Sequence, residues 1–509
     1  MEHDGYNLHL LKSGTDLRGV ASGDPASITL TPEHAWRAAV GFARWLKSTS
    51  KSKLSLTNGD AAAEKLFCIA VGRDSRLMGD ELAKAVRNGL NSQEVATLDL
   101  GLSTTPAMFM ITQDEHHICD AAVMVTASHL PARYNGLKFI IQTGGLESSE
   151  LDAVIKQTDG LDSQYKSDHR SDLTLNGSVD FSPYYLDGFT QQVCSTLGAN
   201  GEAEKPLNGL HVVIDASSGS GGFYAQWLES LGADISGSIN LKPDGTFPAH
   251  NPNPEDESAI KALSAATLKA GADLGVILDA DCDRAALVAA DGSPLYRERL
   301  IALCADMVIR ETPGAAIVTD SVTSPALRAF IERRGGVHRC YKRGYKNVIS
   351  EAKRLNDSGV VCPLAIETSG HAAFADNRFL DDGMMLATRL IIEAVKMKRE
   401  GKTLTDRIAD LTEQLESVEW RITMEDSVRR SESLELMRRW IKDHPQAGYN
   451  LVDSAEGVRA ERAGGWFLLR GSLHEPMLVW NAASDISGGV ERMKADLIDA
   501  LQLQIDSQT

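Results

Sequence analysis

Short apolar runs alternate along the chain with polar turns and with stretches of helical periodicity. Apolar runs at 67–71, 211–214 and 315–318 are each followed by a turn rich in Gly, Asp or Ser. A helical pattern follows each turn, near 79–91, from about 223, and near 324–334. Repetition of strand, turn and helix predicts several α/β units with mostly parallel sheets. In such units ligands bind at the carboxyl ends of strands, where these polar turns fall.

Changes in this rhythm indicate where the domains end. Two polar stretches, 161–182 and 197–207, lack periodicity, and the pattern changes again after about residue 400. Beyond that point a charged helical stretch at 426–443 precedes two strand-like runs, which is typical of a smaller α+β domain. The fold class is therefore α/β, and we expect four domains, at 1–185, 186–295, 296–400 and 401–509.

Length and charge narrow the class of protein. At 509 residues the chain is too long for a single core, and its 43% hydrophobic and 24% charged content is ordinary for globular proteins. The net charge of −18 argues against nucleic-acid and anionic-membrane partners, both of which favour basic surfaces. An anionic substrate would need local cationic groups, backbone N–H groups or a metal.

Cysteine usage and the first residues indicate the compartment. The seven cysteines lack CxxC spacing, and an odd, unpaired set is typical of a reducing compartment. The start, Met1-Glu-His-Asp-Gly, is not basic, and no run approaches the ~20 apolar residues of a membrane span. We expect a cytoplasmic protein that acts as a monomer or small homo-oligomer, with no membrane or nucleic-acid partner.

Three carboxylates at every second position follow the apolar run 274–278. Asp279, Asp281 and Asp283 would point the same way from an extended segment, and they can converge if the chain curves slightly. Carboxylates so close repel one another without a counter-ion, and Mg²⁺ or Ca²⁺ takes such oxygen ligands. A solvated acidic turn is the alternative interpretation of this segment taken alone.

An EF-hand does not explain this acidic segment. Such a loop requires Gly at its sixth position and Glu at its twelfth. Arg284 and Ala290 occupy these places, so we exclude an EF-hand.

A serine followed by a histidine lies directly after another apolar run, at 121–125. Ser128 would project its hydroxyl into any crevice at the end of that strand, with His129 beside it. Ten residues later a turn returns a cation, Lys138. A hydrolytic triad would need an acidic partner that the sequence does not place, and no GxSxG elbow surrounds Ser128.

Two further polar segments suit a polyol and a phosphate, respectively. Residues 367–371 offer a carboxylate, hydroxyls and an imidazole, which can hold a polyol, although a capped helix start is the alternative. In 470–476, Arg470 and Ser472 lie in a Gly-containing turn that resembles a phosphate cradle. Arg18 lies in another Gly-bounded loop, 14–19.

Taken in order, these segments resemble the loops of the α-D-phosphohexomutase superfamily, which includes phosphoglucomutase, phosphomannomutase and phosphoglucosamine mutase. The matching segments are TASHLP at 126–131, DADCDR at 279–284, IETSGH at 366–371 and RGSLHEP at 470–476. PDGTFPAHNPNPE at 243–255 and GTDLRG at 14–19 are also similar to segments of that family. The resemblance spans nearly the whole chain. It implies three related α/β domains and a smaller C-terminal α+β domain around a central cleft.

The resemblance also implies roles for individual residues. Ser128 would carry the phosphate, which would complete a Mg²⁺ shell formed with Asp279, Asp281 and Asp283. The expected phosphate-neutralising and nearby residues are Lys138, Arg284, Arg18 and His129. Sugar and substrate contacts are expected from Glu367, Ser369, Gly344 and Lys346, and contacts to the non-reacting phosphate from Arg470, Ser472 and His474. His371, Lys138 and Arg18 are the candidates for the base, of which His371 has the most suitable ordinary pKa.

The implied reaction interconverts hexose 1-phosphate and hexose 6-phosphate, of glucose, mannose or both. A hexose 1,6-bisphosphate would be the intermediate and the primer. Alternatives are a phosphoglucosamine mutase or another sugar-phosphate mutase, and a non-catalytic phosphosugar-binding protein. The presence of Ser128, the three aspartates and Lys138 argues against the last, because a binder needs no phosphorylatable serine beside a complete metal shell.

Several positions depart from the superfamily pattern. Ala280 and Cys282 replace glycines, Ile366 replaces another glycine, and Leu130 replaces an asparagine. In the phosphate loop Leu473 and His474 replace a small or polar residue and a threonine. A histidine can still donate a hydrogen bond to phosphate, so we expect a divergent branch with an altered phosphate pocket.

Overall fold

The computed structural model describes residues 6–54, 67–117, 119–161, 177–424, 427–472 and 477–502. Two compact units account for the chain. Unit 1 comprises Met1–Leu295 and Leu380–Gly401, and unit 2 comprises Tyr296–Phe379 and Lys402–Thr509. Within the described ranges, no helix combines the length and apolar character needed to cross a membrane.

The first α/β domain of unit 1 is built on a sheet of order β1-β2-β6-β5-β3-β4-β8, with β7 paired to β6. Its strands are β1 (Lys12–Ser13), β2 (Asp16–Val20), β3 (Cys68–Arg73), β4 (Ala96–Leu102), β5 (Ala121–Val125), β6 (Tyr134–Ile141), β7 (Gly144–Gly145) and β8 (Gly177–Ser178). Its helices are α1 (Pro32–Leu54), α2 (Gly79–Asn91), α3 (Thr105–Met110) and α4 (Ser148–Lys156).

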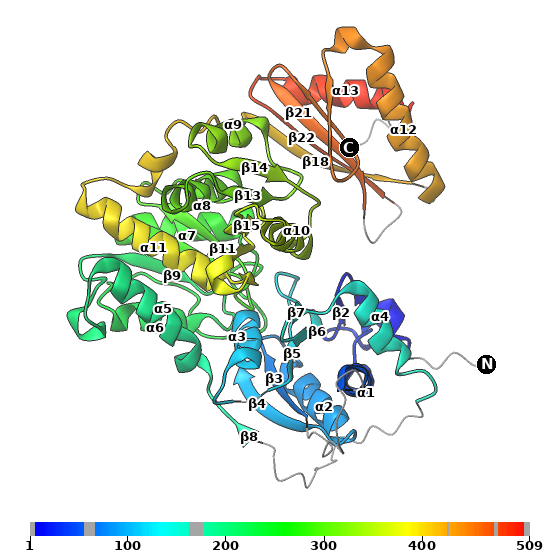
Figure 1. Cartoon of the computed structure of the whole chain (residues 1–509), viewed down its shortest axis with the longest axis vertical. Helices are drawn as coiled ribbons and strands as arrows, with labels where there is room; N and C mark the ends of the chain where they lie inside the picture. The colour runs from blue at the N-terminus through cyan, green and yellow to red at the C-terminus, as the bar shows by residue number, and fades with distance from the viewer. Residues whose placement is uncertain are drawn as a thin grey trace. The chain divides into compact units, whose positions relative to one another are not determined.

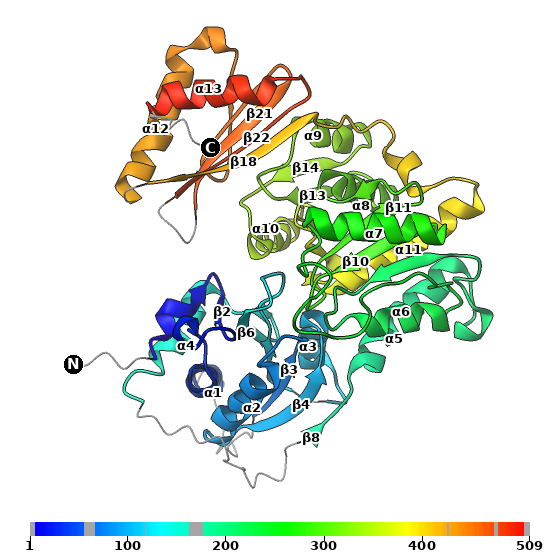
Figure 2. The same ribbon diagram turned by 180° about the vertical axis from the view of Figure 1, so that it is seen from behind.

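Helices cover both faces of this sheet. The helices α1, α2 and α4 (Figure 1) share one apolar core with β3, β5 and β6. In this core Phe42 packs on Phe139. On the opposite face Met108 of α3 lies against Gly72, where a Cβ would come within 2.5 Å of the Met108 sulfur. Figure 2 shows the same domain from behind. Both faces of the sheet are therefore covered by helices, and the loops lie at the ends of the strands.

The second domain of unit 1 has a sheet of order β12-β11-β10-β9. Its strands are β9 (Val212–Asp215), β10 (Leu274–Leu278), β11 (Ala285–Ala289) and β12 (Pro294–Leu295). The accompanying elements of unit 1 are α5 (Ser182–Leu197), α6 (Gly222–Ser230), α7 (Glu257–Ala270), β17 (Leu380–Asp381) and α11 (Gly383–Arg399). Both α7 and α11 pack on this sheet, and α11 also contacts α5.

Unit 2 contains a third α/β sheet and a C-terminal antiparallel sheet. The strands of the former that belong to unit 2 have the order β14-β13-β15-β16, and the latter sheet has the order β18-β22-β21-β20-β19. The elements of the third domain are β13 (Ala316–Thr319), β14 (Val337–Cys340), β15 (Leu364–Ile366), β16 (Ala372–Phe374), α8 (Glu298–Glu311), α9 (Pro325–Arg333) and α10 (Tyr345–Asp357). Those of the last domain are β18 (Glu416–Thr423), β19 (Asn450–Val452), β20 (Val458–Arg462), β21 (Gly465–Gly471), β22 (Met477–Ser484), α12 (Ser427–Asp443) and α13 (Gly489–Leu501). Figure 1 shows α12 and α13 against this last sheet.

The three α/β sheets repeat one arrangement around their central strands. A central strand pairs in parallel with a neighbour on one side: β5 with β3, β10 with β9, and β15 with β13. On the other side it pairs antiparallel with the strand that follows it: β6, β11 and β16. The sheets are thus mixed, and the expectation of mostly parallel sheets is wrong, because each chain reversal returns a strand beside its predecessor.

Three α/β sheets and a smaller C-terminal domain of antiparallel strands and helices confirm the predicted fold class. The motif loops are the reversals of this arrangement: 126–131 follows β5, 279–284 joins β10 to β11, and 367–371 joins β15 to β16. The domain limits at 185, 295 and 400 stay a prediction.

Candidate active site

The three aspartates predicted to bind a metal converge in unit 1. Asp279, Asp281 and Asp283 lie in the reversal between β10 and β11, are all buried, and offer oxygens within 4.8 Å of one another. Cys282 has a left-handed backbone (φ 63°), and with Ala280 it is fully buried. The curvature that the sequence required is therefore present.

The electrostatics of this turn favour a cation. Burial, with repulsion from Asp283 and Asp281, raises the pKa of Asp279 well above its ordinary value. The Oδ1 atom of Asp281 is buried and has no hydrogen-bond partner among the described residues. An acceptor oxygen left in this way fits a hard divalent cation, which binds carboxylates without needing a donor hydrogen. The donor set therefore fits a metal centre.

Ser128 lies against this acidic turn. It follows β5 and is 1% exposed, and its Oγ donates a hydrogen bond to Asp279 Oδ2 at 2.9 Å. The ring of His129 is next to it, with Nδ1 at 3.4 Å from Ser128 Oγ. The hydroxyl is thus directed at the aspartates.

Cationic side chains face the same aspartates. The ammonium of Lys138, on β6, lies 2.8 Å from Asp281 Oδ2 and 2.5 Å from Asp283 Oδ2. Arg284 Nε lies 3.9 Å from carboxylate oxygens of both Asp279 and Asp283.

Arg18 on β2 adds a further guanidinium. It pairs with Asp16 at 2.8 Å and is close enough to Asp281 and Asp283 to be stabilised by them. Although burial opposes its charge, Asp16 and these aspartates hold the pKa of Arg18 above its ordinary value. Its Nε is buried without an acceptor among the described residues, which suits a phosphate. Unit 1 therefore contains the predicted serine, the three aspartates and the cationic residues predicted to lie near them.

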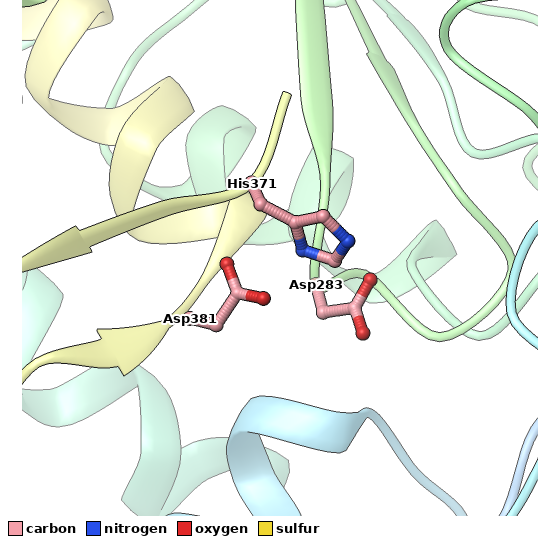
Figure 3. A group of neighbouring side chains, drawn as sticks. All are labelled: Asp283, His371 and Asp381. Atoms are coloured by element: carbon pink, nitrogen blue, oxygen red, sulfur yellow. The ribbon is translucent and has the colours of Figure 1, made fainter. Parts of the chain in front are cut away.

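The sequence did not predict two residues that lie against the acidic reversal between β10 and β11. The Thr105 hydroxyl donates to Asp281 Oδ2 at 2.5 Å, and its backbone N–H donates to the Asp281 carbonyl. Asp381, on β17, is buried, and one of its carboxylate oxygens lies within 4.8 Å of one of Asp283. Figure 3 shows the two side chains. Burial and the neighbouring Asp283 raise the pKa of Asp381 well above its ordinary value. The only sequence signal for Asp381 is the pair of acidic residues at 381–382, directly after a short apolar run.

The predicted sugar loop forms a tight turn in unit 2. Glu367 N–H donates to the carbonyl of His371, and its Oε1 accepts a 2.6 Å hydrogen bond from the backbone N–H of Gly344. Ser369 Oγ lies 3.4 Å from Glu367 Oε2. Burial, together with the negative charge of Asp320, raises the pKa of Glu367 to about 7. Glu367 and Ser369 are thus adjacent, and Glu367 changes charge near neutral pH.

The other predicted residues of this domain are His371, Gly344 and Lys346. The imidazole of His371 (Figure 3) stacks on Tyr345 with ring centroids 5.1 Å apart and planes 25° apart. Gly344, which has φ 112° and so a backbone that favours glycine, precedes α10, and Lys346 lies in its first turn. The third domain therefore gathers Glu367, Ser369, His371 and Gly344.

The predicted phosphate loop is described in part. Arg470, at the end of β21, is buried, its Nε has no acceptor among the described residues, and burial lowers its pKa. The backbone N–H of Ser472 donates to Met477 O at 2.8 Å, so Ser472 closes the hairpin to β22. His474, like Leu473, lies outside the described residues. Arg343 was not predicted, although its charge acts on Arg470.

Known proteins match along the chain. Models described as "Phosphoglucomutase/phosphomannomutase, alpha/beta/alpha domain I", domain II and domain III match residues 10–164, 183–292 and 297–415. A phosphomannomutase/phosphoglucomutase of Pseudomonas syringae pv. tomato is 31% identical over 84% of this chain and 85% of its own length. One from Pseudomonas aeruginosa is 29% identical over 94% of this chain and 92% of its own.

A solved structure has the same fold. It is a phosphoglucomutase/phosphomannomutase family protein of Burkholderia thailandensis, with a TM-score of 0.74 and 24% identity over 97% of this chain and 98% of that one. The family models together cover well over half of the sequence, and a relative above 30% identity extends along most of it. The chain therefore belongs to the phosphoglucomutase/phosphomannomutase family, a family of isomerases.

Proposed function

We propose that the protein interconverts hexose 1-phosphate and hexose 6-phosphate, of glucose, mannose or both, through a phosphorylated Ser128. The observation that carries this proposal is the hydrogen bond from Ser128 Oγ to Asp279, within a buried group of three aspartates contacted by Lys138. Relatives named phosphomannomutase/phosphoglucomutase support the choice of hexoses. A binding protein would gain nothing from a buried serine hydroxyl in this environment.

Asp279, Asp281 and Asp283 would hold one Mg²⁺. When bound, the ion neutralises the three carboxylates and stabilises negative charge on a transferring phosphoryl group. The oxygen-only donor set fits Mg²⁺ better than metals that prefer sulfur or imidazole. Residues of the chain supply every other group that the proposed reaction needs.

Ser128 exchanges one phosphoryl group with the substrate in two opposite steps. In the first, a P–O bond forms to the free hydroxyl of hexose 1-phosphate while the bond to Ser128 Oγ breaks, which yields free Ser128 and a hexose 1,6-bisphosphate. In the second, Ser128 takes the other phosphate and the 6-phosphate is released. Lys138 and Arg18 stabilise the negative charge of the phosphoryl oxygens. Asp279 accepts the hydrogen bond that orients the unphosphorylated hydroxyl of Ser128.

We assign the remaining substrate contacts to the predicted sugar and phosphate loops. Glu367 and Ser369 accept and donate hydrogen bonds to sugar hydroxyls, and Arg470 and Ser472 bind the phosphate that does not react. His371 takes the proton of the attacking hydroxyl and later returns it. The uncommitted Nε of Arg470 and the stacked, buried ring of His371 support these roles.

The test is conversion of glucose 1-phosphate to glucose 6-phosphate with Mg²⁺ and a trace of glucose 1,6-bisphosphate. Mannose 1-phosphate and glucosamine 1-phosphate are assayed in parallel, so that another sugar preference is detected. We expect turnover on glucose or mannose phosphate that is lost on chelation of the metal. No turnover on any sugar, from protein that also fails to retain phosphate on Ser128 after bisphosphate priming, would instead establish a non-catalytic binder.

A further inference from the structure

We propose that Arg76, Asp74 and Thr126 are positioning residues that fix the backbone of Ser128. The inference rests on the proposed function only in assigning the reactive group to Ser128. All the contacts involved lie within unit 1. Thr126 belongs to the motif loop 126–131, whereas Asp74 and Arg76 lie outside the matching segments.

The backbone of Ser128 adopts a conformation that serine does not favour. Its φ is 53°, in the left-handed region where the Cβ of an L-residue is crowded. Both of its backbone polar groups are nevertheless held. The N–H donates to Thr126 Oγ1 at 2.8 Å, and the carbonyl accepts a hydrogen bond from Arg76 Nη2. A strained residue persists where its surroundings hold it in this way.

All five N–H groups of the Arg76 guanidinium donate hydrogen bonds to Asp74 or to backbone carbonyls near Ser128. Its side chain is fully buried, and Nε donates to Asp74 at 3.1 Å. The four other donors reach backbone carbonyls of the serine loop and the start of β6, which are those of Ser128, Leu130, Pro131 and Tyr134. A guanidinium has five N–H donors, so none remains for a phosphate. Arg76 therefore acts on the loop and not on the substrate.

Asp74 closes the network between Arg76 and Thr126. Its carboxylate accepts from the Arg76 backbone N–H at 2.9 Å, from Arg76 Nε, and from Thr126 Oγ1 at 2.6 Å. Since the Thr126 hydroxyl donates to Asp74, its oxygen lone pairs face the Ser128 N–H. The chain of contacts thus runs from Arg76 through Asp74 and Thr126 back to Ser128, and every member is buried.

The segment 243–255 covers this network from the second domain. The ring of Phe247 lies 5.0 Å from the Arg76 guanidinium carbon, and Gly245 forms an isolated parallel bridge with Arg76. A Cβ on Gly245 would approach the Ser75 carbonyl to 2.4 Å, so only glycine permits this contact. Exclusion of water by this cover strengthens the hydrogen bonds beneath it.

This network predicts an effect on turnover rather than on substrate binding. Displacing Ser128 Oγ by a fraction of an ångström misaligns it with the phosphoryl group, and a misplacement of about 1 Å can cost roughly 100-fold in rate. We expect Thr126→Val, which keeps the shape but removes the hydroxyl, to lower kcat by about 10- to 100-fold with KM nearly unchanged. Thr126→Ser restores the hydroxyl and should recover most of the rate. Arg76→Lys, with three donors for five acceptors, should behave like Thr126→Val.

A matched control separates positioning from general stability. Arg37, in α1 of the same domain, is buried and donates to Glu33 and to the Leu161 carbonyl, away from Ser128. Arg37→Lys should lower the melting temperature without lowering kcat of the folded enzyme. Loss of kcat in Arg37→Lys equal to that in Arg76→Lys would overturn the inference, as would a wild-type kcat in Thr126→Val.

A measurement independent of turnover distinguishes failure of this inference from failure of the proposed function. Hydrogen exchange at the Ser128 amide should be slow in the wild type, at least ten times faster in Thr126→Val, and slow again in Thr126→Ser. Equal exchange in the wild type and Thr126→Val refutes the positioning role even if the enzyme is active. Absence of turnover in a wild type with a protected Ser128 amide refutes the mutase function and leaves the network intact.

Discussion

The buried hydroxyl of Ser128 donates to Asp279 at 2.9 Å, and the ammonium of Lys138 contacts the other two aspartates of the same group. Because the phosphoryl group must pass through Oγ in both directions, Ser128→Ala should lower kcat by about 10³-fold or more. The change removes one hydroxyl at a small side chain, so the fold should stay intact. Turnover with priming bisphosphate and the intact mass of the primed protein measure the effect.

A distant serine provides the control for this substitution. Ser195 is exposed on α5 and donates only to the carbonyl of Gln192. Ser195→Ala should retain turnover and a mass increase of one phosphate after priming. Near-normal turnover in Ser128→Ala, or unchanged phosphate uptake, would contradict the assignment of Ser128.

Glu367 predicts a pH dependence near neutrality. Burial raises its pKa from 4.5 to about 7, so it is protonated below about pH 7 and accepts sugar hydroxyls fully only above it. We expect kcat/KM to rise between about pH 6 and 8, and Glu367→Gln to lower it by about 10- to 100-fold while flattening this rise. The substrate phosphate titrates in both enzymes, so the difference between their profiles isolates Glu367.

The same shift has a consequence for stability, with a definite sign. The folded protein holds the Glu367 proton up to about pH 7, whereas the unfolded chain releases it near 4.5. The contribution of Glu367 to stability therefore falls as pH rises from about 4.5 to 7. Glu367→Gln should remove this slope from the melting temperature. Glu332→Gln, on an exposed face of α9, should leave both profiles unchanged.

Individual residues of the site differ in how far sequence could predict them. Asp279, Asp281 and Asp283 are close in sequence, and their spacing alone implies convergence. Thr105 and Asp74, by contrast, act on partners 176 and 52 residues away, so no local pattern marks them. Predictions from spacing therefore recover groups within one turn and miss the contacts that tertiary structure creates.

At the scale of elements, each motif loop is supported by the turn that ends the neighbouring parallel strand. In the first domain Asp74, after β3, accepts from Thr126, and in the third Asp320, after β13, accepts from Thr368 at 2.7 Å. In the second domain Ser220, after β9, donates to the Ala280 carbonyl at 2.7 Å. Parallel neighbours end at the same edge of a sheet, which brings these turns together.

The sequence predicted the central strands of these domains because they are fully buried apolar runs. The predicted runs 121–125 and 274–278 are β5 and β10, and the predicted helix 79–91 is α2. The direction of the following strand was not predictable, because an apolar run carries no mark of which neighbour it pairs with. The sequence therefore did not show that β6 and β11 pair antiparallel with β5 and β10, which makes these sheets mixed.

The reversal between β10 and β11 predicts stabilisation by a divalent cation. Burial, together with repulsion from Asp283 and Asp281, raises the pKa of Asp279, and a bound cation would relieve both effects. We expect Mg²⁺ to raise the melting temperature of the wild type in a concentration-dependent way. Asp281→Asn should weaken this response by roughly 10-fold or more in Mg²⁺ concentration, and extra Mg²⁺ should restore activity only in part.

An acidic residue outside the reversal provides the comparison. Asp291 lies in the turn after β11 and is exposed, so Asp291→Asn lowers the net negative charge equally without touching the three aspartates. Its Mg²⁺ response should match the wild type. A wild-type midpoint in Asp281→Asn would show that the ion binds elsewhere.

At the scale of the whole molecule, the two units carry different parts of the proposed chemistry. Unit 1 contains Ser128 and the three aspartates, and unit 2 contains the sugar and phosphate loops. The chain has a net charge of −18, yet the partly buried Arg18 and the buried Arg470 are both proposed to bind phosphate. Binding of an anionic substrate therefore depends on a few local cations, because the overall field repels it.

This division predicts that changes in unit 2 affect binding while the chemistry of Ser128 persists. Arg470 is buried and keeps an uncommitted Nε, so it can give a charge-assisted hydrogen bond to the non-reacting phosphate. Arg470→Ala should raise KM for glucose 1-phosphate by about 10- to 100-fold, the loss expected for a hydrogen bond to a charged group. Phosphorylation of Ser128 at saturating bisphosphate should still reach one group per chain.

Arg421 allows this contact to be separated from a general loss of positive charge. It lies on β18 near Arg470, its side chain is 60% exposed, and it already pairs with Glu419. Arg421→Ala removes the same charge but leaves the buried Nε of Arg470 in place, so KM should change by less than about 3-fold and mainly at low salt. If both variants raised KM equally, and added salt abolished the difference from wild type, the phosphate would be attracted by the field of unit 2 and not bound by Arg470.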